Sequence, residues 1–175
     1  MQKRVAVIIA NGSEEIEAIT PIDVFRRTDA VCDIVSVAEL TVTCSRNVRV
    51  TADKLIGEVS LSDYDAIVIP GGMPGATNIA NCRHVIDGLK VAITKGKVVG
   101  AICASPAVVL ACNGLLDGVK ATCYPAPDFI KMMEKSVYTA TDVEVDKNVI
   151  TANGPRSALA FSLELCKRLG LTPKF

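Results

Sequence analysis

The sequence predicts an α/β fold in which a mostly parallel central sheet carries helices on both faces. Short runs rich in β-branched residues alternate with longer segments of helical period. The runs are also apolar almost throughout, as expected of strands covered on both faces. The chain has 175 residues, half of them apolar, and contains no repeat, linker or sustained run of charge. We therefore expect one domain over residues 1–175.

Five runs carry the strongest strand signal, and we expect them to form the interior of the sheet. They are residues 4–10, 32–37, 66–70, 98–102 and 148–152. Residues 41–50 and 143–145 are more polar, which favours edge strands or a hairpin. Residues 119–123 are ambiguous.

Three segments are predicted to be helices. Residues 13–28 begin with Ser13 as a candidate N-cap, and three acidic residues follow in the first turn, where the helix dipole favours negative charge. Pro21 is expected to kink or interrupt this helix. Residues 82–94 and 157–169 are amphipathic and should cover the sheet.

Composition excludes several classes of protein. Nineteen basic residues balance nineteen acidic ones, so no net charge attracts nucleic acid or anionic lipid. The first apolar run breaks at Asn11, which is too early for a signal peptide. The most apolar stretch, residues 98–112, is too short and too interrupted to span a membrane. We expect a cytoplasmic protein with neither nucleic acid nor membrane as a partner.

Sulfur is the unusual feature of the composition. The seven cysteines are dispersed, without a CxxC pair or a Cys/His cluster, at positions 32, 44, 82, 103, 112, 123 and 166. This pattern predicts neither a disulfide framework nor a metal site. Most of these thiols are expected to be small apolar fillers in a reducing compartment.

One cysteine stands where chemistry is expected. Ligands of open α/β sheets bind beyond the carboxyl ends of the strands. Three such ends are followed by Asn-Gly-Ser-Glu-Glu at 11–15, Gly-Gly-Met-Pro-Gly at 71–75 and Cys-Ala-Ser-Pro at 103–106. Cys103 lies at the turn into a helix whose first turn suits Pro106, and the start of that helix should lower the thiol pKa. We predict Cys103 to be the nucleophile.

The partner of this thiol is expected to be a carboxyl group. The only histidine, His84, starts the 82–94 helix on its polar side, which indicates a solvated role. Glu14 and Glu15 are explained by the helix dipole. Glu17 is predicted to point inward and to stay protonated beside a thiolate, where it acts as an acid. Backbone N–H groups of the glycine loop can stabilise an oxyanion.

These residues, in this order, resemble the ThiJ/PfpI family, in the branch that contains the Parkinson-associated protein deglycase and its bacterial relatives. The resemblance is carried by GSEEIE at 12–17, TPIDVFRR at 20–27, TCSR at 43–46, YDAIVIPGGMPGA at 64–76, VGAICASPAVVLA at 99–111, KMM at 131–133 and TANGP at 151–155. The motifs extend from the first strand to the last helix.

The resemblance implies a flavodoxin-like fold, a homodimer and no cofactor or metal. It implies that Cys103 is the functional thiol, that Glu17 is the protonated glutamate, and that the N–H groups of Gly72 and Ala104 form the oxyanion site. Arg46 and Arg27 fall on arginines placed near the active site or the dimer interface.

Members of this branch are described as glutathione-independent glyoxalases (lyases of the glyoxalase III type), as deglycases (hydrolases) of early glycation adducts, and as oxidative-stress sensors or redox-regulated chaperones whose cysteine becomes a sulfinic acid. The resemblance thus implies a reactive dicarbonyl or a glycated protein as substrate, with a non-enzymatic sensor as the alternative. A peptidase is disfavoured because no Cys/His pair can be assembled. The sequence departs from the branch at Tyr124, where a histidine is common, and at Ser105, where glycine is common.

Overall fold

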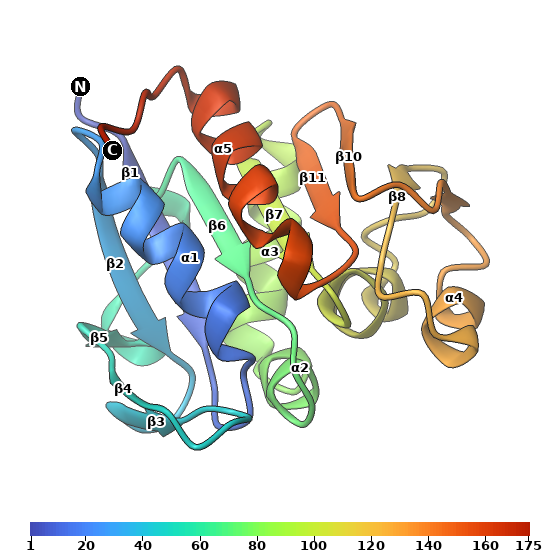
Figure 1. The fold of residues 1–175 in the computed structure, drawn as a ribbon, viewed down its shortest axis with the longest axis horizontal. Coiled ribbons are helices and arrows are strands. Elements are labelled where there is room, and N and C mark those ends of the chain that lie inside the picture. The colour runs from blue at the N-terminus through green and yellow to red at the C-terminus, as the bar shows by residue number, and fades with distance from the viewer.

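A computed structural model describes residues 1–175 as a seven-stranded sheet with helices on both faces (Figure 1). The strand order is β10-β11-β7-β6-β1-β2-β5. All neighbours pair in parallel except β10 and β11, which form an antiparallel hairpin at one edge. The strands are β1 (Arg4–Ile9), β2 (Val31–Ser36), β5 (Lys54–Leu55), β6 (Ala66–Ile69), β7 (Val98–Ile102), β10 (Val143–Asp146) and β11 (Val149–Ala152). The predicted α/β class and the five interior strands are confirmed.

Two short ribbons lie outside the main sheet. The polar stretch after β2 forms the antiparallel hairpin of β3 (Thr41–Thr43) and β4 (Arg49–Thr51). The ambiguous stretch at 119–123 contributes β8 (Lys120–Ala121), which pairs in parallel with β9 (Val137–Tyr138).

The helices divide between the two faces of the sheet. The five α-helices are α1 (Glu15–Arg26), α2 (Gly75–Ala80), α3 (Arg83–Thr94), α4 (Pro127–Met132) and α5 (Ala158–Leu169). In Figure 1, α1 and α5 lie side by side in front of the sheet, and α3 lies behind it. Residues 106–113, which follow β7, form a π-helical turn and then a 3₁₀ turn. None of the helices is both long enough and apolar enough to cross a membrane.

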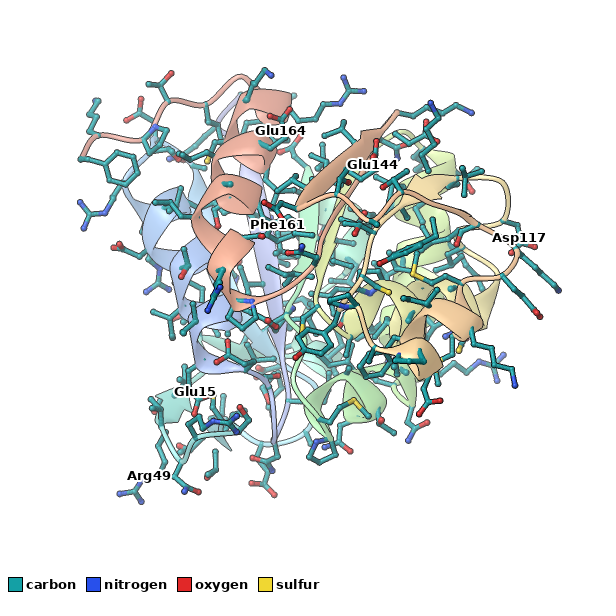
Figure 2. The ribbon with its side chains drawn as sticks, turned by 45° about the vertical axis from the view of Figure 1, so that its right-hand side comes forward. Glu15, Arg49, Asp117, Glu144, Phe161 and Glu164 are labelled. Atoms are coloured by element: carbon teal, nitrogen blue, oxygen red, sulfur yellow. The ribbon has the colours of Figure 1, made fainter.

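The alternation of side chains along β1 explains why the sheet needs both layers. Val5, Val7 and Ile9 pack into the cluster that contains α1 and α5, including the buried ring of Phe161 on α5 (Figure 2). Ala6 and Ile8 pack into the other cluster, with α2 and α3. Successive residues of a strand face opposite sides, so a strand apolar throughout needs cover on both.

The first helix differs from its prediction in two respects. Glu14, rather than Ser13, is the N-cap, and its carboxylate accepts from the backbone N–H of Glu17 at 2.9 Å. The helix also runs unbroken through Pro21, although proline removes a backbone donor. Packing of α1 against the sheet and α5 holds the segment helical at that point.

Candidate functional site

The predicted convergence of loops at the carboxyl edge of the sheet is present. β6 and β7 are aligned in parallel register, so the loop that begins at Gly71 and the turn at Cys103 leave the sheet side by side. α1 begins at the same edge, after β1, because Glu14 N donates to the carbonyl of Gly71 at 3.0 Å. A cavity of about 390 Å³ opens there. Its lining residues are Glu14, Ser45, Arg46, Gly72, Met73, Cys103, Ala104, Tyr124, Phe129 and Pro155.

Cys103 occupies the strained turn that ends β7. Its φ is +65°, in the left-handed region that residues with a side chain rarely adopt. Two backbone bonds hold this conformation: Cys103 N donates to the Ala152 carbonyl, and Tyr124 N donates to the Cys103 carbonyl, each at 2.8 Å. Strain held by its surroundings is common at functional sites. The thiol is half-buried and faces the cavity.

Glu17 approaches the thiol from α1 and is fully buried. Its Oε2 accepts from the N–H of Gly71 at 2.8 Å, while Oε1 has no hydrogen-bond partner. Burial raises the pKa of Glu17 to about 7, against the hydrogen bonds with Cys103 and Gly71, which lower it. A pKa of about 7 keeps most Glu17 carboxyl groups protonated below neutral pH, and Oε1 is the oxygen without a partner.

Gly71 is the residue that permits this approach. A Cβ at position 71 would lie 2.6 Å from Cys103 Cβ, 2.7 Å from Glu17 Oε2 and 2.9 Å from the Ile102 carbonyl oxygen. Such distances are shorter than any normal contact between non-bonded atoms. Only glycine therefore allows the loop, the thiol and the carboxyl to meet.

The thiol pKa differs from the sequence expectation. Burial raises the pKa of Cys103 to about 12, and a charged Glu17 adds to the rise, while the N–H groups of Gly72 and Ala104 act in the opposite direction. The start of the following helix was expected to lower this pKa, but burial outweighs that effect. A protonated Glu17 carries no charge, so the part of this rise that comes from Glu17 is absent while the carboxyl keeps its proton.

The structure assembles most of the predicted site residues. Gly72 and Ala104 direct their N–H groups at the sulfur, and Tyr124 and Arg46 line the cavity. Arg27 is the exception. It caps the far end of α1, where its guanidinium bonds Asp23 and stacks on Phe175. A helix of twelve residues separates that position from the start of α1, so the expectation that Arg27 lies near the site is not met within one chain.

Glu15 does more than place a negative charge at the start of α1, which is the only role that its sequence position indicated. Its nearly buried carboxylate accepts from Ser45 Oγ at 2.9 Å and from the backbone N–H groups of Arg46 and Val48. These bonds lower the pKa of Glu15, although burial opposes them. Figure 2 shows Glu15 beside the β3–β4 hairpin, at the same end of the molecule as Arg49. Glu15 therefore anchors the turn that carries Ser45 and Arg46 into the cavity. No sequence pattern indicated this pairing, which spans about thirty residues.

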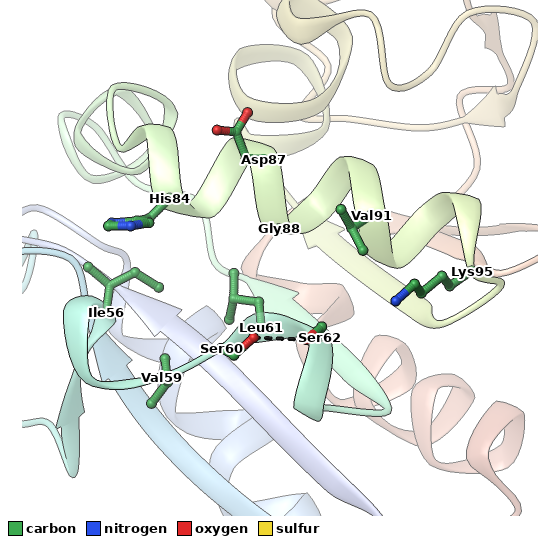
Figure 3. A pocket seen from close by; sticks show the side chains of 10 residues that line it. All are labelled: Ile56, Val59, Ser60, Leu61, Ser62, His84, Asp87, Gly88, Val91 and Lys95. Atoms are coloured by element: carbon green, nitrogen blue, oxygen red, sulfur yellow. Dashed lines mark hydrogen bonds between the residues drawn. The ribbon is translucent and has the colours of Figure 1, made fainter.

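His84 lies elsewhere, as expected. It borders a separate cavity of about 520 Å³ between α3 and the 3₁₀ turns at 56–63 (Figure 3). That cavity shares no residue with the one at Cys103. No group of three or more His, Cys, Asp or Glu side chains is arranged to hold a metal ion.

Comparison with known proteins agrees with this geometry. The chain is 41% identical over 166 residues to Protein DJ-1 homolog A of Arabidopsis thaliana, covering 94% of this chain and 42% of that protein. It is 34% identical over 170 residues to the Parkinson disease protein 7 homolog of Danio rerio, covering 95% of this chain and 89% of the relative. The chain spans less than half the length of the Arabidopsis relatives that it matches.

Solved structures show the same fold. The structure described as Toxoplasma gondii DJ-1, oxidized, superposes with a TM-score of 0.90 at 43% identity, covering 95% of this chain and 90% of that one. Drosophila melanogaster DJ-1beta superposes with a TM-score of 0.91 at 33% identity, covering 97% and 91%. The DJ-1/PfpI family description matches residues 3–168. The chain therefore belongs to the DJ-1/PfpI family.

Proposed function

We propose that this protein is a cysteine-dependent enzyme that acts on methylglyoxal-type dicarbonyls or on early glycation adducts without glutathione or any other cofactor. One observation carries the proposal: the buried, protonatable carboxyl of Glu17 lies directly beside a thiol that receives two backbone N–H groups and faces the cavity. A thiol and an acid paired in this way suit addition to a carbonyl, because one forms the bond to carbon and the other moves the proton.

The proposed steps need no external oxidant, because one carbon of methylglyoxal is oxidised while its neighbour is reduced. The Cys103 sulfur adds to the aldehyde carbon of methylglyoxal, and the carbonyl oxygen takes the Glu17 proton to give a hemithioacetal. The Glu17 carboxylate then removes the hydrogen from that carbon as a proton and returns it to the neighbouring ketone carbon, while the hydroxyl proton moves to the ketone oxygen, which gives a lactoyl thioester. Water cleaves the thioester, releasing lactate and the free thiol. The N–H groups of Gly72 and Ala104 stabilise the negative oxygen of each addition step. A glycation adduct already carries the amine on that carbon, so here the sulfur displaces it: the C–S bond forms as the C–N bond breaks, the departing amine takes the Glu17 proton, and the same hemithioacetal results.

Turnover of methylglyoxal tests this proposal. Wild-type protein should consume methylglyoxal and form lactate, and both Cys103→Ser and Glu17→Gln should abolish the activity. Cys112→Ser is the matched control, because that cysteine is exposed and lies outside the Cys103 cavity. Wild-type turnover no faster than that of Cys103→Ser would refute the enzyme proposal.

A second candidate function is a non-enzymatic sensor of oxidative stress or a redox-regulated chaperone. It is favoured by the same N–H groups, which can also stabilise the oxygens of a sulfinate on Cys103. Dilute peroxide should then add two oxygen atoms to the peptide containing Cys103 before the other six thiols react. Mass spectrometry would count against this function if oxidation were spread evenly over all seven cysteines.

We further propose that the protein is a homodimer that uses the outer surface of α1 and α5. Four apolar side chains are exposed on this surface, namely Ile16, Ile19, Leu159 and Leu163. Because α1 and α5 pack side by side, these residues can form one patch that a second copy would cover. The molar mass from light scattering should be twice that of the chain, and Ile16→Glu with Leu159→Glu should halve it. A wild-type monomer would refute the dimer.

We also infer a cytoplasmic location from the state of the thiols. All seven cysteines are free, and four of them are buried. Free buried thiols of this kind are typical of reducing compartments. A fluorescent fusion found in an oxidising compartment would contradict this inference.

A further inference from the structure

A second cavity adjoins the one at Cys103. It has a volume of about 510 Å³ and is lined by Tyr124, Pro125, Asn153, Gly154, Pro155 and Arg156. Tyr124 and Pro155 belong to the walls of both cavities. A molecule whose carbonyl lies at Cys103 can therefore extend past these two side chains toward Arg156.

The wall between the two cavities is held in place from several sides. The backbone N–H of Tyr124 donates to the Cys103 carbonyl at 2.8 Å, and its ring meets Phe129 edge to face at a centroid distance of 6.4 Å. A Cβ on Gly154 would be in ordinary contact with that ring, at 3.5 Å, so the ring lies close over the glycine backbone. The hydrogen bond to the Cys103 carbonyl thus fixes the position of Tyr124 relative to the thiol.

Most polar groups of the outer cavity are already paired. Asn153 Nδ2 donates to Asp142 Oδ1 at 2.9 Å, and Asn153 Oδ1 accepts from Ser157 Oγ at 2.7 Å. These bonds occupy the Asn153 amide and one oxygen of the Asp142 carboxylate. The guanidinium of Arg156 is different, because it is exposed and takes part in no ion pair and no hydrogen bond. Its charge is available to a ligand.

The charges along the joined cavities favour an anion at the outer end. Arg46 and Glu14 both line the inner cavity, and Arg46 forms no salt bridge. The opposite charges of Arg46 and Glu14 offset each other in the inner cavity, whereas Arg156 lines the outer cavity without any acidic side chain. A substrate matched to this arrangement is neutral at its reacting carbonyl and negative at its far end.

We propose that Tyr124 and Arg156 form an outer subsite that binds a carboxylate or phosphate at the end of the carbonyl substrate remote from its aldehyde. This inference rests on the proposed function, and it narrows the substrate class from small dicarbonyls in general to those with an anionic tail. A guanidinium can pair with either anion through two hydrogen bonds.

Three substrates of similar size test the subsite. They are 2-oxopentanal, which is neutral, 4,5-dioxopentanoate, which ends in a carboxylate, and hydroxypyruvaldehyde phosphate, which ends in a phosphate. Arg156→Ala should raise KM about tenfold for the substrate or substrates whose anion is bound and leave kcat unchanged, as expected for loss of one charged pair. The KM for 2-oxopentanal should not change. Whichever anionic substrate responds identifies the anion that the subsite takes.

Two variants complete the test. Arg168→Ala removes the same charge from an exposed arginine on α5 that lines neither cavity, so it should leave all three KM values unchanged. Arg156→Lys should recover part of the loss, because it keeps the charge without the planar fork. Equal effects of Arg156→Ala on neutral and anionic substrates, or no effect on either, would overturn the proposal.

A second measurement separates this proposal from the enzyme proposal. If wild-type protein turned over none of the three substrates, the proposed activity would fail but the subsite would still be open to test. The compound 4-oxopentanoate has the carboxylate without the aldehyde, and inorganic phosphate supplies the other anion. Either should slow alkylation of Cys103 by iodoacetamide in the wild type and not in Arg156→Ala. Absence of any protection, or equal protection in both proteins, would overturn the subsite.

Discussion

Replacement of Glu17 by Gln should make the protein more stable at neutral pH and not at acid pH. The pKa of Glu17 is raised from its ordinary value of 4.5 to about 7 by burial, so the folded state binds a proton that the unfolded chain has released between these values. Stability contributed by the protonated carboxyl is therefore fully present below pH 4.5 and is lost as pH rises through about 7. A shift of this size corresponds to about 3 kcal/mol. Glutamine keeps an oxygen for the Gly71 N–H and cannot ionise, so the stability of Glu17→Gln should not fall over this pH range.

The assay is chemical denaturation over a series of pH values from 4 to 8, on Glu17→Gln and its parent, with both chains carrying Cys103→Ser. The serine removes titration of the neighbouring thiol, and all other carboxyl groups cancel in the difference between the two proteins. The free energy of unfolding of Glu17→Gln minus that of the parent should rise with pH, by about 3 kcal/mol in total, and level off above pH 7. A difference that stayed flat with pH would show that Glu17 titrates normally and would remove the basis for its role as an acid.

Three further substitutions test other parts of the site. Gly71→Ala should lower stability by about 1–3 kcal/mol through overpacking against Cys103 and Glu17, and an unchanged melting temperature would contradict the close approach. Glu15→Ala should cost about 1–3 kcal/mol by leaving the 45–48 turn without its acceptor. Glu15→Gln should lower the free energy of unfolding by less than Glu15→Ala does. This loss should shrink as pH falls below 4.5, because the pKa of Glu15 is lowered in the folded state and its charge stabilises the fold fully only above that value. Equal effects of Ala and Gln in urea denaturation would refute the anchoring role. Tyr124→His should raise the rate of Cys103 alkylation by iodoacetamide about tenfold at neutral pH, because an imidazolium that lowers the thiol pKa by one unit raises the thiolate fraction tenfold; an unchanged rate would show that position 124 does not influence the sulfur.

The parts of the molecule that sequence analysis predicted well are those governed by local patterns. Apolar runs located both ends of each interior strand to within one residue, because strands buried on both faces leave few other interpretations. The position of Cys103 followed from the same patterns, since a cysteine between a strand and Pro106 marks a turn at the carboxyl edge of the sheet.

The parts that it missed depend on contacts between distant segments. The hydrogen bond between Glu15 and Ser45 joins α1 to the hairpin after β2, and the sequence of neither segment indicates this pairing. The continuity of α1 through Pro21 reflects packing against α5, which local propensity does not include. The raised pKa of Cys103 comes from the depth of its burial, a property of the folded chain that strand and helix signals do not report.

The left-handed backbone at Cys103 has an evolutionary consequence. A residue with a side chain costs about 1–2 kcal/mol in this conformation, whereas glycine adopts it freely. Replacement of Cys103 by glycine would therefore release this strain, although it would remove the thiol and the contacts that its half-buried side chain makes with the cluster under α1 and α5. In descendants of this protein that no longer need the thiol, glycine should become frequent at position 103. The residue at this turn in each descendant therefore indicates whether the thiol is still used.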